Sequence, residues 1–138
     1  MVKDTIDKVL SVLSITADVK ITAFGSYTDI PGSAKGIYIL VEGERVIYVG
    51  KGNIKARQVQ HWNKAHNNIT RNTKDTDGWR WLRENCEITP TTWMIYHMSL
   101  RKETEKTAVE GMLIHLLQPL ANDETYNDRL VEAANTRV

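Results

Sequence analysis

The chain has 138 residues, a formal net charge of +1 at pH 7 and a single cysteine, Cys86. This length suits one domain with its own core, which we expect to span 1–138, and one cysteine excludes both a disulfide framework and a multi-cysteine zinc site. The sequence contains neither a signal-peptide pattern nor an apolar run of membrane-spanning length, so we expect a soluble, intracellular (cytoplasmic) protein with no membrane partner.

The first half of the chain predicts a helix, a strand and a hairpin. A short amphipathic helix follows Asp4, which is a candidate cap, and a strand is expected over 19–24. A turn-rich loop comes next, before a β-hairpin with strands 36–41 and 45–49.

Helices alternate with a loop and a further strand in the middle of the chain. Asn53 is the expected N-cap of a helix that runs to about Ala65. Residues 67–78 are polar and predict a loop, and residues 78–85 predict a short helix. Residues 91–98 predict a third strand, paired with the hairpin.

The last third predicts a long helix and a polar tail. The helix begins near 99–104 and ends before Pro119, and the tail, 123–138, contains one helical turn near Leu130. The expected apolar stripe of the helix is Val109, Met112, Leu113, Leu116 and Leu117. The fold class is therefore α+β, with helices packed around a small antiparallel sheet of three or four strands.

Basic residues are concentrated in one segment. Residues 45–83 contain nine Lys and Arg against two Asp, a balance of +7, whereas the rest of the chain has a balance of −6. Two interpretations are open: a face that approaches a polyanion, or a solvated surface with uneven charge.

Three positions are candidates for chemistry, each with a plainer alternative. Tyr38 and Tyr48 lie on the two hairpin strands, but strand tyrosines also simply pack, and their relative position depends on the register. Glu110 lies at the edge of the long helix's apolar stripe, so its carboxylate either has a cation or metal partner or reaches water.

The helix after the hairpin presents a second pair. Arg57 and His61 are four residues apart and share one face, which we expect to point outward. The opposite face, with Ala56, Val59 and Trp62, is expected to be buried. The alternative interpretation is a pair of polar residues on a solvated helix.

These elements together resemble the GIY-YIG nuclease family. Gly36-Ile37-Tyr38 matches the first motif, and Tyr48-Val49-Gly50 matches a frequent variant of the second. The run from Gly50-Lys51 through Asn53 to Arg57 is similar to the family's G-K and N-L-x-x-R. His61 stands where many members have a histidine, and Glu110 followed by Leu117-Gln-Pro-Leu-Ala-Asn122 is similar to the last signature. The resemblance covers 34–122; it leaves 1–33 as an N-terminal extension.

The resemblance implies a metal-dependent DNA endonuclease that hydrolyses phosphodiester bonds, of phage or mobile-element origin. A restriction, repair or recombination nuclease of the same family, or an inactive nucleic-acid-binding module, remains an alternative. So does a structural or interaction domain whose letters coincide with the motifs. Cutting both strands of a duplex would suit a homodimer.

The resemblance also implies roles for individual residues. Glu110 would hold Mg²⁺ or Mn²⁺, and Arg57 would pair with the scissile phosphate. Tyr38 is the favoured general base with Tyr48 as its neighbour, although His61 could instead orient water or act as base. Lys51 and Arg57 would favour the phenolate.

Further residues are expected to support catalysis or hold DNA. Lys51 and Asn122 would support the site. The expected contacts to nucleic acid are Lys51, Lys55, Lys64, Arg71 and Lys74. Trp62, Trp79 and Trp81 could stack on bases, or could be core residues.

Overall fold

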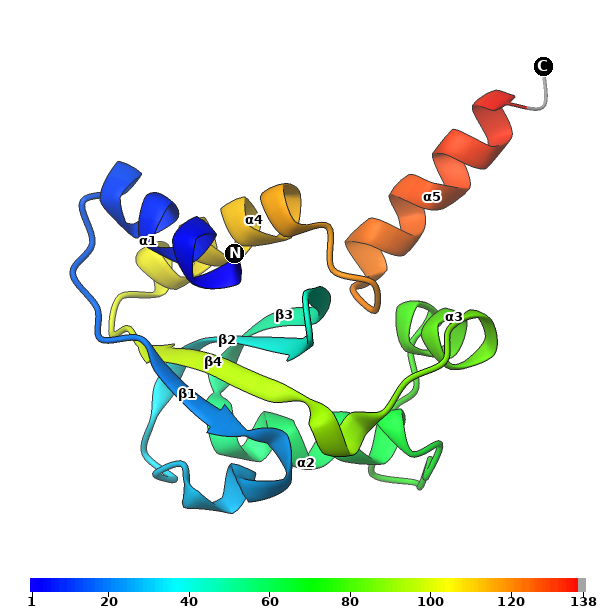
Figure 1. Cartoon of the computed structure of the whole chain (residues 1–138), viewed down its shortest axis with the longest axis horizontal. Coiled ribbons are helices and arrows are strands. Elements are labelled where there is room, and N and C mark those ends of the chain that lie inside the picture. The colour runs from blue at the N-terminus through cyan, green and yellow to red at the C-terminus, as the bar shows by residue number, and fades with distance from the viewer. Residues whose placement is uncertain (137–138) are drawn as a thin grey trace.

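A four-stranded antiparallel sheet forms the centre of the computed structural model, which describes residues 1–136. Its strands lie in the order β1 (Lys20–Ala23), β4 (Met94–Ser99), β2 (Lys35–Glu42) and β3 (Arg45–Asn53) (Figure 1). The predicted hairpin and third strand are confirmed, and β1 is the fourth strand. β3 continues four residues past its predicted end.

β2 alternates its side chains between two hydrophobic layers. Ile37 and Ile39 face one layer, whereas Tyr38 and Leu40 face the other. A central strand covered on both faces reads as a continuous apolar run, which is why every residue from Gly36 to Val41 is buried.

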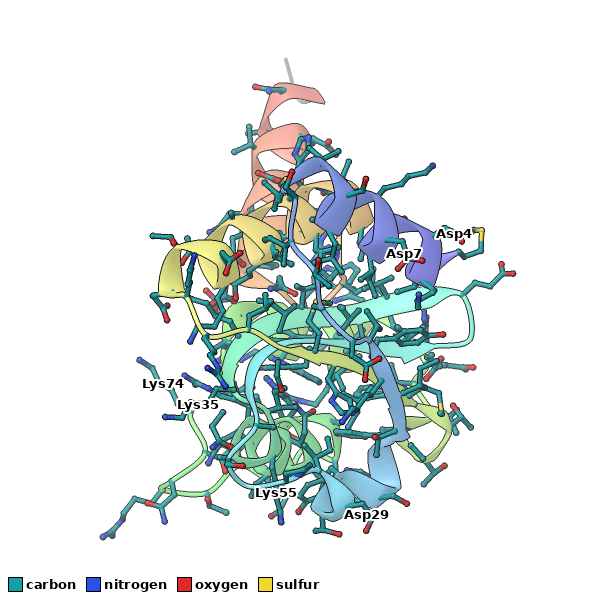
Figure 2. All side chains as sticks on the ribbon, turned by 90° about the vertical axis from the view of Figure 1, so that its left-hand side faces the viewer. Asp4, Asp7, Asp29, Lys35, Lys55 and Lys74 are labelled. Carbon is teal, nitrogen blue, oxygen red and sulfur yellow. The ribbon has the colours of Figure 1, made fainter. Side chains whose placement is uncertain are left out.

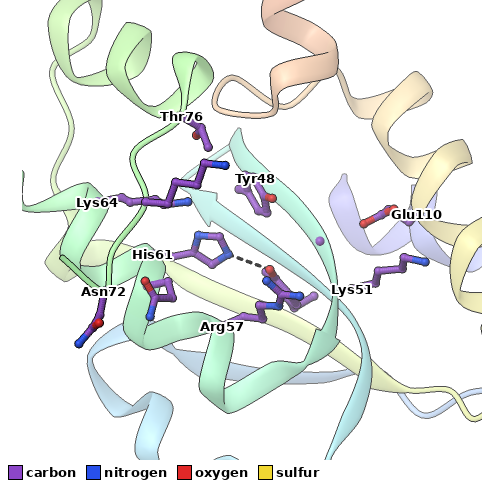
Figure 3. A pocket seen from close by; sticks show the side chains of 12 residues that line it. Tyr48, Lys51, Arg57, His61, Lys64, Asn72, Thr76 and Glu110 are labelled. Carbon is purple, nitrogen blue, oxygen red and sulfur yellow. Dashed lines mark hydrogen bonds between the residues drawn. The ribbon is translucent and has the colours of Figure 1, made fainter. Parts of the chain in front are cut away.

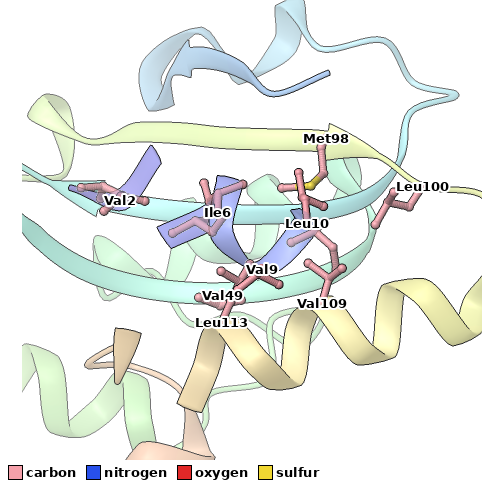
Figure 4. Close-up of a cluster of buried hydrophobic side chains, with 12 residues drawn as sticks. Val2, Ile6, Val9, Leu10, Val49, Met98, Leu100, Val109 and Leu113 are labelled. Atoms are coloured by element: carbon pink, nitrogen blue, oxygen red, sulfur yellow. The ribbon is translucent and has the colours of Figure 1, made fainter. Parts of the chain in front are cut away.

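Helices α1 (Val2–Val12) and α4 (Glu103–Leu117) cover one face of the sheet. Ile6 and Val9 of α1 pack with Val109 and Leu113 of α4 in this core (Figure 4). The N-terminal extension is thus part of the core. Two expectations are corrected. Helix α1 starts at Val2 with Met1 as N-cap, so Asp4 lies within its first turn. Leu116 is 54% exposed because it points away from the sheet.

The opposite face is covered by α2 (Ile54–Ala65), α3 (Asp77–Asn85) and a 3-10 helix, η1 (Phe24–Asp29), which lies in the predicted loop. Phe24 and Trp93 stack with ring centroids 5.3 Å apart, next to the fully buried Trp79. A second 3-10 helix, η2 (Pro90–Thr92), leads into β4.

The tail is a helix, α5 (Asp123–Thr136), and not the single turn that we expected near Leu130. The segment is polar because only one side of the helix packs against the rest of the protein. It therefore lacks the apolar stripe that predicts a helix. The Arg129 guanidinium lies 3.8 Å from the ring centre of Trp81 on α3, and Thr125 is buried. The helix then projects away from the sheet (Figure 1). Residues 137–138 of the predicted tail lie outside the described residues.

Charged side chains lie at both ends of the molecule. Asp4 and Asp7 lie on the outer side of α1, and Lys55 and Asp29 lie at the opposite end of the molecule (Figure 2). No helix within residues 1–136 combines the length and the apolar character that crossing a bilayer requires.

Candidate active site

A cleft of about 470 Å³ opens at the β3 edge of the sheet, between α2 and α4 (Figure 3). It brings together eight of the residues singled out in the sequence, which are Tyr38, Tyr48, Lys51, Arg57, His61, Lys64, Lys74 and Glu110. The motif residues, which are up to 72 positions apart, therefore converge on one surface hollow.

The strand register places both tyrosines on one face of the sheet. Tyr38 pairs with Gly50, and Tyr48 pairs with Leu40, so the two phenols are diagonal neighbours on adjacent strands. Their rings are stacked with centroids 6.2 Å apart. This register answers the question that the sequence left open.

At two motif positions a neighbouring group lies so close to the backbone that only glycine fits. A Cβ at Gly50 would collide with the Tyr38 hydroxyl and lie 2.8 Å from Tyr48, so the bare backbone makes room for the phenol. A Cβ at Gly36 would collide with the Met98 carbonyl oxygen, so this glycine allows β4 to approach β2. Both glycines thus position the tyrosines.

His61 is buried, contrary to the expectation that it points outward with Arg57. Helix α2 turns Ile54, Gln58, His61 and Ala65 toward the sheet, leaving Val59 42% exposed. The apolar residues of this helix predicted the wrong buried face, because the face that packs on the sheet includes the polar residues Gln58 and His61.

The burial of His61 brings it into contact with Tyr38 inside the cleft. His61 Nε2 lies 2.7 Å from the Tyr38 hydroxyl, and its ring is 4.5 Å from that of Tyr48. The ring of Trp79 stacks with the imidazole at 5.3 Å and lies 5.8 Å from that of Tyr48. The imidazole thus packs against a cluster of aromatic rings, with one nitrogen at hydrogen-bond distance from the phenol of Tyr38.

Burial holds this pair in its neutral form. It raises the pKa of Tyr38 well above its ordinary value, with the neighbouring Tyr48 adding to the rise and Arg57 opposing it. It lowers the pKa of His61 to about 3, helped by the charges of Lys64 and Arg57. At neutral pH a neutral imidazole therefore faces a neutral phenol.

Tyr48 is also kept as a phenol. Burial raises its pKa to about 12, and the carboxylates of Glu124 and Glu110 add to the rise. The expectation that Lys51 and Arg57 favour a phenolate holds in direction for Arg57, but burial outweighs it. Lys51 instead binds α4, with Nζ 2.6 Å from Glu103 and 2.9 Å from the Thr107 hydroxyl.

Glu110 faces the cleft from α4, on the far side of β3 from His61 (Figure 3). It is half-buried, and it forms no hydrogen bond or ion pair with any described residue. Burial raises the pKa of this carboxyl, while Lys51 opposes the rise. Residues 1–136 contain no group of three His, Cys, Asp or Glu that could hold a metal. As a half-buried carboxylate without a protein partner, Glu110 has the chemistry of a single protein ligand to Mg²⁺, where water and phosphate oxygens complete the shell.

Unpaired cations line the same cleft. Arg57, Lys64 and Lys74 form no ion pair within the described part of the chain, and Lys51 is shared with Glu103. Burial lowers the pKa of the half-buried Lys64 ammonium, while the carboxylates of Asp75 and Asp123 oppose the shift. Such an excess of positive charge over one carboxylate suits a phosphate ligand.

Asn122 acts on the site from behind β3. Its side chain accepts a hydrogen bond from Val49 N at 2.9 Å and donates one to Val49 O at 2.8 Å. The amide thus replaces a neighbouring strand at the sheet edge, between the positions of Tyr48 and Gly50. The supporting role in catalysis that we expected of Asn122 stays a prediction.

Lys55 and Arg71 lie apart from the cleft. Lys55 lines a separate hollow with Tyr27 and Val59, and Arg71 is exposed in the loop after α2. Trp79 is fully buried and Trp62 packs on Phe24. These tryptophans are core residues.

The sequence reasoning missed Gln60, Asn72 and Thr76, which also line the cleft. Gln60 could have been found from its helical spacing after Arg57. Asn72 and Thr76 carry no such signal, because their loop is placed by tertiary bonds such as Arg83 to Asp75 at 2.7 Å.

Comparison with known proteins adds no relative to this geometry. No family model matches the chain, and searches of curated proteins and of solved structures found no similar protein.

Proposed function

We propose that this protein is a metal-dependent nuclease of the GIY-YIG type, which hydrolyses DNA phosphodiester bonds in the β3-edge cleft. One observation carries the proposal: a buried, hydrogen-bonded Tyr38–His61 pair and an unpartnered Glu110 line the same cation-rich cleft. The motif order in the sequence and the four-stranded sheet support the same assignment.

The cations of the cleft would bind and orient the phosphate. Arg57 is exposed and unpaired, so its planar fork is free to donate to two phosphate oxygens. Lys64, which forms no ion pair with a described residue, would neutralise further charge, and a phosphate beside it would favour its charged form. A Mg²⁺ or Mn²⁺ ion held by Glu110 would supply Lewis-acid stabilisation of the phosphoryl oxygens and of the departing 3′ oxygen.

Tyr38 and His61 would handle the proton of the attacking water. As water attacks the phosphorus, its proton passes to the Tyr38 oxygen while the Tyr38 proton passes to His61 Nε2. This relay requires the tautomer of His61 that leaves Nε2 free to accept. The negative charge of the phosphate favours the imidazolium that burial otherwise opposes.

A plasmid-nicking assay tests the proposal. Wild-type protein with Mg²⁺ should nick or linearise supercoiled plasmid, and a chelator should abolish the reaction. Glu110→Gln should lower the rate by about a hundredfold or more, whereas Glu105→Gln, on α4 outside the cleft lining, should cut like wild type. Absence of cutting by wild type at every divalent ion tried would refute the nuclease, and retained DNA binding in that case would favour a binding module.

A further inference from the structure

A basic groove runs beside the cleft, on residues outside the GIY-YIG-like motifs. Two hollows of about 380 and 310 Å³ adjoin one another, because Ser33 and Ser99 line both of them. Lys20 lies in the first hollow, and Lys35 and Arg101 lie in the second. We call these five residues, together with Lys106, the basic groove.

The charges of this groove are largely unneutralised. Lys20, Lys35 and Arg101 are exposed and form no ion pair with any residue in 1–136, and the one carboxylate in the lining is Asp18. Two serine hydroxyls between the cations add neutral hydrogen-bond donors. Cations interleaved with hydroxyls are the groups that contact the phosphates of a nucleic-acid strand.

One carboxylate links a lysine of the groove to a lysine of the cleft. Glu103 accepts Lys51 of the cleft at 2.6 Å on one oxygen and Lys106 of the groove at 3.0 Å on the other. The two lysines are therefore held at neighbouring positions on either side of Glu103. Lys35 of the groove and Lys74 of the cleft also project toward the same side of the molecule (Figure 2).

The backbone beneath the groove is fixed by hydrogen bonds. Leu100 N donates to Lys35 O at 3.0 Å, and Ile54 N donates to Ala34 O at 3.1 Å. The Asn53 side chain donates to Gly32 O at 2.7 Å. The cations thus project from a preformed surface, which reduces the ordering cost of binding.

We propose that the basic groove binds the phosphates that flank the scissile phosphate, so that one nucleic-acid strand runs from the cleft past Glu103 toward Lys20. This inference rests on the proposed function, because the cleft defines where the strand begins. It assigns part of the contact with DNA, which was expected of the 45–83 segment, to Lys20 at the start of β1, Lys35 at the start of β2 and Arg101 between β4 and α4. Lys20 and Lys35 lie on strands of the central sheet, so the sheet itself fixes the positions of two of these cations.

The test is the salt dependence of binding, measured by fluorescence anisotropy with a labelled DNA duplex in a chelator, where no cutting occurs. Lys35→Ala/Arg101→Ala should bind roughly tenfold more weakly, and its plot of log affinity against log salt should be shallower by about 1.8, since each lost phosphate contact removes about 0.9. Lys35→Arg/Arg101→Lys should restore both values. Lys8→Ala, exposed on α1 and outside both hollows, should bind like wild type.

The outcomes separate this inference from the proposed function. If wild type binds and cuts DNA while Lys35→Ala/Arg101→Ala keeps the wild-type affinity and salt slope, the groove proposal alone is wrong. If wild type binds no DNA and cuts none, the proposed function falls and the groove proposal falls with it.

Discussion

At the scale of single residues, the contact between Tyr38 and His61 decides the chemistry of the cleft. Both groups are buried, and burial favours the neutral form of each. A neutral imidazole can accept a proton from a neutral phenol across 2.7 Å, whereas an imidazolium could not. The site thus keeps its acceptor available throughout the neutral pH range.

The buried imidazole should make stability depend on pH. The pKa of His61 is about 3 in the folded protein, whereas an unfolded histidine titrates near 6.5, so the unfolded chain binds the extra proton between these values. Stability from this residue is complete above about pH 6.5 and is lost as the pH falls toward 3. The free energy of unfolding of each protein is measured by urea titration at pH 7 and at pH 5. The decrease from pH 7 to pH 5 should be about 2 kcal/mol smaller for His61→Gln than for wild type. His115→Gln, exposed on α4, should follow wild type; equal pH dependence in both variants would contradict this account.

Gly50 should be intolerant of any side chain. Gly50→Ala places a methyl group on the Tyr38 hydroxyl, so it should destabilise the protein by about 1–3 kcal/mol and displace the phenol. Gly111→Ala is the matched control, because its Cβ meets nothing within 4 Å and it lies inside α4. That variant should gain roughly 0.5–1 kcal/mol in urea unfolding. If Gly50→Ala left the unfolding free energy unchanged, the Tyr38 phenol would not occupy this position.

At the scale of elements, an edge strand is held in place by a side chain. β3 has β2 on one side only, and Asn122 satisfies both backbone groups of Val49 on the other. This contact links the segment after α4 to the strand that carries Tyr48.

Removing this amide should loosen the strand. Asn122→Ala leaves the Val49 N–H and C=O without partners, so we expect a loss of about 2–4 kcal/mol in urea unfolding. Asn127→Ala, on the exposed side of α5, should change stability little. Equal unfolding midpoints for the two variants would mean that Asn122 does not hold β3.

Strands and most helices could be predicted from the sequence because their signals are local. Asn53 caps α2 through its contact with Ala56 N at 3.0 Å, as the sequence indicated. The rotation of α2 could not be predicted, because its buried stripe includes Gln58 and His61. Nor could α5, since its support comes from the contact of Arg129 with Trp81 on a distant helix.

At the scale of the whole molecule, the fold divides the basic residues of 45–83 into those that form ion pairs within the protein and those that do not. Arg83 forms an ion pair with Asp75, and Arg80 forms ion pairs with Asp75 and Asp77. Arg57 and Lys64 are left free in the cleft. The sequence could show the excess of charge, but only the tertiary structure separates structural cations from those available to a ligand.

The central claim is that Glu110 serves the chemical step and not the grip on DNA. The most direct measurement compares single-turnover cleavage and DNA affinity for Glu110→Gln and wild type under the same ionic conditions. We expect cleavage slower by about a hundredfold or more with an affinity within about twofold of wild type, because the lost carboxylate would hold the metal while the cations would hold the phosphates. Unchanged cleavage by Glu110→Gln, or a loss of affinity that accounts for the whole loss of rate, would contradict it.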